Sequence, residues 1–150
     1  MSKVRVQVEG LKELDAKLKD FDGKLAKTIV KRALRAGAKV TLTSARALAP
    51  QKTGRLRSAI KVMAGKSRKG YVSITVGIGK KWFEGDEFYA AFQEFGWKSG
   101  RRGLGDKRKA NPGEHYVEGA FDETKHAAVA RITEVLREQI EKELRKSGGK

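Results

Sequence analysis

Pro50 is the residue that most limits what this chain can fold into, because it separates a long helical pattern from two strand patterns. Proline has no backbone N–H and disfavours helical geometry in the residue before it, so the helix that precedes it is expected to end at Ala49. The hydroxyl of Thr53 can act as the N-cap of a short turn through Arg55 and Leu56. Gly54 lets another backbone approach closely. Together these features predict a structural turn made of Pro50, Thr53, Gly54, Arg55 and Leu56.

Two long helices are predicted on either side of this turn. From Lys24 to Leu48 the apolar residues form two stripes, so the buried arc is wider than one sheet face requires. Small residues dominate both stripes, and with Gly37 they predict contact with a sheet on one side and with a second helix or subunit on the other. A second amphipathic helix is predicted from Phe121 to Arg145, followed by a frayed tail at 147–150, and a shorter one from Leu11 to Phe21.

Strand patterns complete the predicted fold. Lys3 to Val8 alternates strictly between apolar and polar residues, which is the period of a half-buried strand. Ser58 to Ala64 and Tyr71 to Ile78 read as a hairpin joined by a glycine-containing loop. We therefore predict an α+β fold, in which a mostly antiparallel sheet of three to four strands is packed by the central and C-terminal helices. With 150 residues the chain is expected to form a single domain, 1–150.

An aromatic segment follows the hairpin. Ala90 to Phe95 suggests a turn or two of helix ended by Gly96 in the left-handed C′ position. Aromatic residues this dense finish a core or anchor an interface, and the sequence gives both readings equal weight. Both this segment and the second stripe of the long helix expose more apolar surface than one small domain covers. The predicted subunit interface has two different patches, one made of Phe92, Glu94, Phe95, Gly96 and Trp97 and the other of Val30 and Leu34.

Positive charge is the strongest compositional signal. The chain has 34 Lys and Arg against 18 Asp and Glu, a formal net charge of +16. Such a surface attracts nucleic acid, anionic membranes or acidic proteins, and composition does not choose among them. A glycine-rich stretch at 98–113 is too polar to order itself and is predicted to be a flexible, partner-binding loop. Its basic residues are Lys98, Arg101, Arg102, Lys107, Arg108 and Lys109.

The sequence contains no arrangement typical of an active site. There is no cysteine, which rules out disulfides and thiolate metal sites. His115 and His126 have no carboxylate or cysteine beside them that would complete a metal site. The acidic residues near the aromatic segment have no fixed separation that would make them a general acid and base. We expect no enzymatic activity, no cofactor and no metal. No apolar run is long enough to cross a bilayer and the N-terminus is unlike a signal peptide, so a soluble, cytoplasmic protein is expected.

The order of these features resembles that of a known family. Ala49-Pro50-x-x-Thr53-Gly54-Arg55-Leu56-Arg57-x-x-Ile60 follows a basic helix and precedes a strand pair, then comes Glu94-Phe95-Gly96, and a C-terminal helix closes the chain. This arrangement is similar to that of the tail-completion proteins of long-tailed bacteriophages, also called tail terminators or head-tail joining proteins. Each tripeptide is common by itself, and the order and spacing carry the resemblance across nearly all of the chain.

The resemblance implies a structural virion protein at the phage neck. It would be made in the host cytoplasm, complete the tail, and join it to the DNA-filled head as a six-fold ring. Its partners would be other copies of itself, the tail tube and the head-connector proteins, with no membrane contact. DNA that passes through such a ring would meet it through phosphate. The alternative is a basic nucleic-acid-binding protein, which is favoured by the net charge, by the basic loop and by a basic row along the long helix, made of Lys24, Lys27, Lys31, Arg35 and Lys39. An anionic-membrane binder is supported by the net charge alone.

Overall fold

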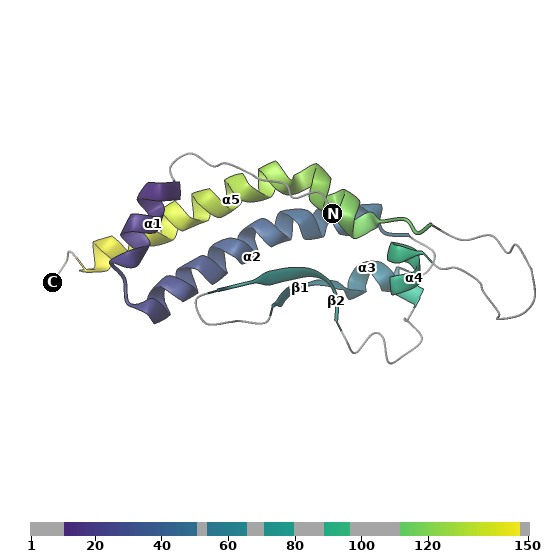
Figure 1. The fold of residues 1–150 in the computed structure, drawn as a ribbon, viewed down its shortest axis with the longest axis horizontal. Helices are drawn as coiled ribbons and strands as arrows, with labels where there is room; N and C mark the ends of the chain where they lie inside the picture. The colour runs from purple at the N-terminus through teal and green to yellow at the C-terminus, as the bar shows by residue number, and fades with distance from the viewer. Residues whose placement is uncertain (1–10, 51–53, 66–70, 80–88, 97–111, 148–150) are drawn as a thin grey trace, which may run out of the picture.

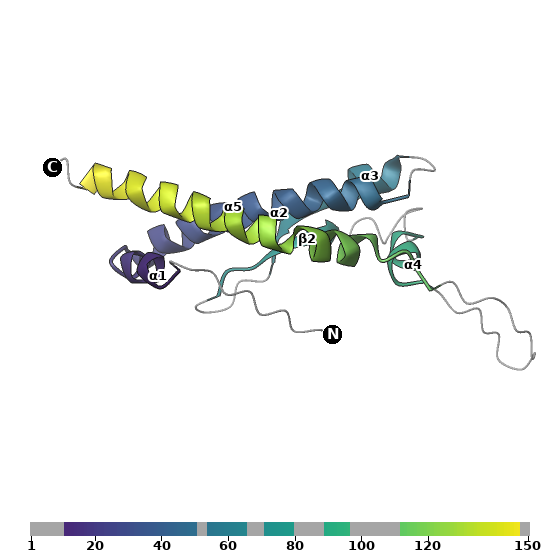
Figure 2. The same ribbon diagram turned by 90° about the horizontal axis from the view of Figure 1, so that it is seen from above.

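Two long helices and a strand pair make up the described part of the molecule. The computed structural model describes residues 11–50, 54–65, 71–79, 89–96 and 112–147. Helices α2 and α5 lie side by side, and the strands lie across α2 from α5 (Figures 1 and 2). The mixed helix-and-sheet class is therefore confirmed. The elements in chain order are α1 (Leu11–Lys19), α2 (Gly23–Leu48), α3 (Arg55–Ala59), β1 (Ile60–Ala64), β2 (Ile74–Ile78), α4 (Tyr89–Phe95) and α5 (Tyr116–Ser147).

Helix α2 has the limits and the close packing that its sequence predicts. The carboxylate of Asp22 caps its start by accepting a hydrogen bond from Lys24 N at 3.0 Å. It ends before Ala49, which is extended as expected for a residue that precedes proline. A methyl group at Gly37 would lie 2.8 Å from the carbonyl oxygen of Ala128 and would overlap Ile132. The glycine therefore allows α2 and α5 to approach closely, while the other side of α2 contacts the strands.

The core has two apolar clusters along the α2–α5 pair. The first joins α1 to the helix pair through Leu14, Ile29, Ala33, Val135, Leu136 and Ile140. The second joins the pair to the strands through Ala45, Ala49, Ile60, Tyr116 and Ala120. Between them, the hydroxyls of Thr41 and Thr124 lie 3.0 Å apart. Thr124 uses its only proton on the carbonyl oxygen of Ala120, so Thr41 must donate to Thr124.

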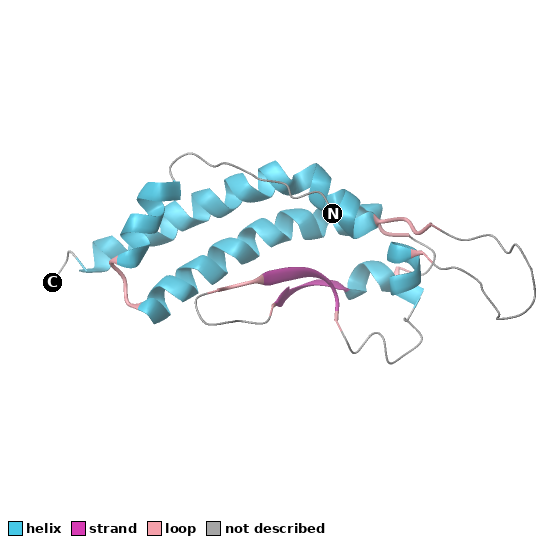
Figure 3. Ribbon diagram, viewed as in Figure 1, coloured by secondary structure: helices cyan, strands magenta, loops and turns pink. Residues whose placement is uncertain are grey.

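The described sheet is smaller than the predicted one. Strands β1 and β2 pair antiparallel with Ile60 opposite Ile78, and they form a two-stranded sheet (Figure 3). The predicted strand at Lys3–Val8 lies outside the described residues. The predicted hairpin strands were also too long. Ser58 and Ala59 belong to α3, in which Ser58 N donates to the carbonyl oxygen of Gly54, and the regular part of the second strand begins at Ile74.

The joint between α2 and β1 is held by arginines. The guanidinium of Arg57 donates to the carbonyl oxygens of Ala47 at 3.0 Å and Ala49 at 3.3 Å, and so satisfies the end of α2. Arg46 reaches from α2 to the carbonyl oxygen of Ile60. The predicted cap was wrong by one residue, because Gly54, with φ 68°, occupies the N-cap of α3. Thr53 lies outside the described residues.

The remaining structural turn residues contribute in different ways. Leu56 packs against the second apolar cluster, whereas Arg55 and Gly54 are exposed. Pro50 is partly buried next to the buried Ala49. The turn therefore anchors the chain through Leu56 and Arg57 and leaves Arg55 in solvent.

The C-terminal helix is longer than predicted at both ends. It begins at Tyr116, five residues before Phe121, and it includes Ser147, which was expected to fray. None of the described helices has an apolar stretch that could span a bilayer. Trp97 and the predicted basic loop residues from Lys98 to Lys109 lie outside the described part of the chain.

Candidate assembly surface

The Glu94-Phe95-Gly96 segment ends α4 as the sequence predicts. Helix α4 stops at Phe95, and Gly96 has a φ of 73°, the left-handed conformation typical of a helix C′ glycine. Helix α4 lies near the end of the molecule where α5 begins (Figure 1).

Glu94 caps the start of α5. Its side chain is buried, with the residue only 7% exposed, and its two carboxylate oxygens accept hydrogen bonds from Val117 N at 3.0 Å and Glu118 N at 3.2 Å. A carboxylate at this position satisfies free N–H groups and is stabilised by the positive end of the helix dipole. This cap explains why α5 begins at Tyr116. It comes from a residue more than twenty positions upstream, so local sequence patterns could not reveal it.

Gly113 locks the segment from the other side. Its φ is 85°, and a methyl group at this position would lie 2.5 Å from both the carbonyl oxygen of Glu94 and the amide nitrogen of Gly96. The following residues bind α4 through backbone hydrogen bonds, from Glu114 N to Gln93 O at 2.6 Å and from His115 N to Glu94 O at 3.2 Å. The end of α4 is thus tied to the start of α5 by backbone and side chain together.

Phe95 points into solvent from this fixed turn. It is 74% exposed, although the residue before it is buried. It borders a cavity of 630 Å³ between α2, β2, α4 and α5, whose wall is mostly apolar. Phe121 lines the same cavity and is 52% exposed. An exposed aromatic pair beside an open apolar cavity is typical of a protein interface. The main apolar lining residues are Leu34, Ala38, Val76, Phe95, Phe121 and Ile132.

The structure brings together only some of the predicted interface residues. Leu34 and Phe95 line the same cavity, together with Glu94, so they belong to one surface of this chain. Val30 packs against the first core cluster instead. Phe92 is exposed without lining the cavity. The sequence reading missed Phe121 as a surface residue, because it was taken only as the start of the amphipathic helix.

Glu94 and His115, which were considered as catalytic or metal-binding candidates, make contacts within the fold. Both oxygens of Glu94 bind backbone amides of α5. His115 is exposed, with Nε2 3.1 Å from the carbonyl oxygen of Pro112 and Nδ1 3.2 Å from Glu118, so the expectation that it lacks an acidic neighbour was wrong. Across the described ranges, no three or more His, Asp or Glu side chains gather as metal ligands would.

Tyr116, buried beside Glu94, makes folding sensitive to alkaline pH. Burial, with added repulsion from Glu94 and Glu114, raises the pKa of its hydroxyl from 10.0 to about 12. Between these values the unfolded chain loses this proton while the folded chain keeps it, so stability should fall as pH rises from 10 to 12. Tyr116→Phe should lack this loss. Thermal midpoints of both proteins from pH 9 to 12 test it, and a constant difference between them would contradict the assignment.

Comparison with known proteins identifies the family. Residues 12–96, more than half of the chain, match a family model described as "Bacteriophage HK97-gp10, putative tail-component". A search of curated proteins and a search of solved structures found no match. The matched region runs from α1 through α2, the joint and the strands to the Glu94-Phe95-Gly96 turn. The chain therefore belongs to this family of bacteriophage tail components.

Proposed function

We propose that this tail component completes the tail at the phage neck and joins it to the head as a ring, with six subunits matching the tail tube. Family membership supports a structural role in the tail and location in the virion. The neck position, the ring and the joining of tail tube to head connector extend that role. The proposal includes no catalytic activity, since assembly needs only matching surfaces.

The observation that carries the proposal is the fixed, exposed Phe95. Capping by Glu94 and the close approach of Gly113 hold the turn before any partner arrives. A preorganised aromatic anchor loses little conformational freedom on binding, and such anchors dominate interface energies. A side chain that served only the fold would be expected inside the core. Phe95 instead stands at the rim of an apolar cavity.

Ring closure determines how this surface is used. A closed ring needs a heterologous interface, in which two different patches meet. Because Leu34 and Phe95 share one cavity, we take them with Phe121 as a single patch, which the next subunit covers with a different surface. The charge of +16 per subunit opposes association in free solution. Assembly is therefore expected on a tail or head surface, which supplies a template.

Phe95→Asp tests the proposal. A charge buried without a partner at the contact costs several kcal/mol, so the variant should fold as wild type yet fail to complete particles. The measurement is the yield of joined heads and tails when the variant replaces wild type, with thermal unfolding to verify the fold. Leu144→Asp is the matched control, because Leu144 is 43% exposed near the end of α5 and does not line the cavity.

The two substitutions together separate the outcomes. Loss of particle completion with Phe95→Asp, but not with Leu144→Asp, would support the cavity as the assembly patch. Normal completion with Phe95→Asp would show that this surface is not used. A separate measurement, the mass of the protein on assembled particles, gives the number of subunits. A number other than six would contradict the six-fold ring.

A further inference from the structure

The charges of α2 are distributed differently from those of the other long helix. Over its 26 residues α2 contains no Asp or Glu. Helix α5 mixes both signs and forms ion pairs such as Arg131–Glu134 and Lys146–Glu143. Mixed charges with such pairs are typical of a solvated helix face. A helix whose charged side chains are all positive is not explained by this pattern. The cations of α2 are Lys24, Lys27, Lys31, Arg32, Arg35, Lys39 and Arg46.

Part of this row lines a groove between the two long helices. The groove has a volume of 610 Å³, and its charged residues are Arg32, Arg35 and Lys39 from α2 with Arg131 from α5. It lies on the side of α2 opposite the apolar cavity. A helix turns by about 100° per residue, so Arg32, Lys39 and Thr43 face roughly 170° away from Leu34, Gly37 and Thr41. The molecule therefore has an apolar assembly surface and a basic groove on opposite sides of α2.

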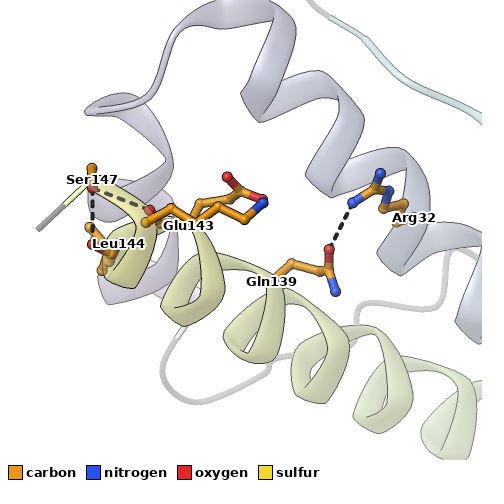
Figure 4. Close-up of polar contacts among 6 residues, drawn as sticks. Arg32, Gln139, Glu143, Leu144 and Ser147 are labelled. Carbon is orange, nitrogen blue, oxygen red and sulfur yellow. Dashed lines mark hydrogen bonds and ion pairs between the residues drawn. The ribbon is translucent and has the colours of Figure 1, made fainter. Parts of the chain in front are cut away.

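The cations in the groove differ in how they are held. Nη1 of Arg32 donates to Oε1 of Gln139 across the helix pair at 3.0 Å, which orients its guanidinium (Figure 4). Arg131 donates to Glu134 at 2.6 Å. Among the described residues, Arg35 and Lys39 have neither a hydrogen bond nor an ion pair to a side chain of opposite charge. Two oriented guanidinium groups thus flank two cations that are available to an outside anion.

The lining of the groove indicates the kind of anion. Protein interfaces are anchored by large apolar and aromatic residues together with Arg. Here the apolar residues between the cations are only Ala36 and Val40. Contact with a phosphate backbone needs just cations and hydrogen-bond donors, which the arginines and Lys39 of the groove supply. The groove is therefore better suited to nucleic acid than to an acidic protein.

We propose that this groove binds the phosphate backbone of double-stranded DNA without sequence preference. The length of α2 fits this partner, because 26 residues span about 39 Å, close to one turn of the double helix at roughly 34–36 Å. Binding would be driven by release of the counterions around the phosphates. The inference goes beyond the neck assignment and rests only on α2 and its groove, so either can fail without the other.

The experiment compares two double variants of the full chain. Arg35→Gln with Lys39→Gln removes the two unpaired cations of the groove. Arg137→Gln with Lys142→Gln removes two exposed cations of α5 outside it, so both variants lose the same charge. Binding to a 30-base-pair duplex is measured by fluorescence anisotropy between 50 and 200 mM KCl. Thermal midpoints close to wild type would verify that both variants are folded.

The expected result is a change in salt dependence. Each phosphate contact contributes about 0.9 to the slope of log K against log salt, so the groove variant should lower the slope by about 1.8. The control should change it much less. Equal changes in both variants would show that net charge alone matters, and a wild type that does not bind the duplex would also overturn the proposal. Displacement of the duplex by polyglutamate at equal charge concentration would point instead to an acidic protein partner and reject DNA.

Discussion

Gly113→Ala is expected to destabilise the protein by at least about 2 kcal/mol. The residue has a φ of 85°, which costs about 1–3 kcal/mol for a residue with a side chain. In addition, the new methyl group would lie 2.5 Å from backbone atoms of Glu94 and Gly96, and rigid backbone cannot move away cheaply. The substitution should therefore separate the end of α4 from the start of α5. Chemical denaturation of the purified variant measures the change.

Gly119→Ala provides the matched control for this prediction. Gly119 lies within α5, and a methyl group there would come no closer than 3.9 Å to Leu48. Alanine in a helix is favoured over glycine by about 0.8–1.0 kcal/mol, so this variant should be slightly more stable than wild type. Opposite signs for the same substitution six residues apart would verify the role of backbone geometry. Equal stability of Gly113→Ala and wild type would show that the turn is not locked as described.

Ile29→Ala is expected to lower the free energy of unfolding by about 2–5 kcal/mol, the range for emptying a buried aliphatic site. Ile29 is 1% exposed and lies in the first core cluster, between α2 and α5. Leu144→Ala removes a side chain of similar size that is 43% exposed, and it should cost well under half as much. Urea denaturation of both variants gives the comparison. If Ile29→Ala left the unfolding midpoint unchanged, the packing of α2 on α5 would be wrong.

Local patterns predicted the elements whose causes are local. The extent of α2 follows from its stripes and from Pro50, and the end of α4 follows from Gly96. The start of α5 did not follow, because its cap is the distant Glu94. The same limit applied to Arg57, whose partners are carbonyl groups that the sequence does not mark. Periodicity also assigned Ser58 and Ala59 to a strand, although the turn that begins at Gly54 draws them into α3.

The candidate site shows a similar division between what can and cannot be read from sequence. Phe95 was predicted from the aromatic segment to be an interface residue; it is exposed, and its place in an interface stays a prediction. Sequence could not show that Leu34 borders the same cavity, because periodicity gives the face of a helix but not the element that packs beside it. The basic row of α2 was visible, but the usual expectation for such a row is a solvated face. Only the packed α5, with Arg131, turns part of that row into a groove.

The arginine contacts at the joint also bear on the order in which the chain folds. Arg57 binds a carbonyl group ten residues away and Arg46 one fourteen residues away, so these contacts close short loops at small entropic cost. The contacts between α2 and α5 join residues 83 and 107 positions apart, as for Thr41 with Thr124 and Arg32 with Gln139. Contacts this distant close much longer loops, at a higher entropic cost. During synthesis α2 and the joint leave the ribosome well before α5, so the part of the apolar face around Ile29 and Ala33 that α5 covers stays exposed until α5 is made.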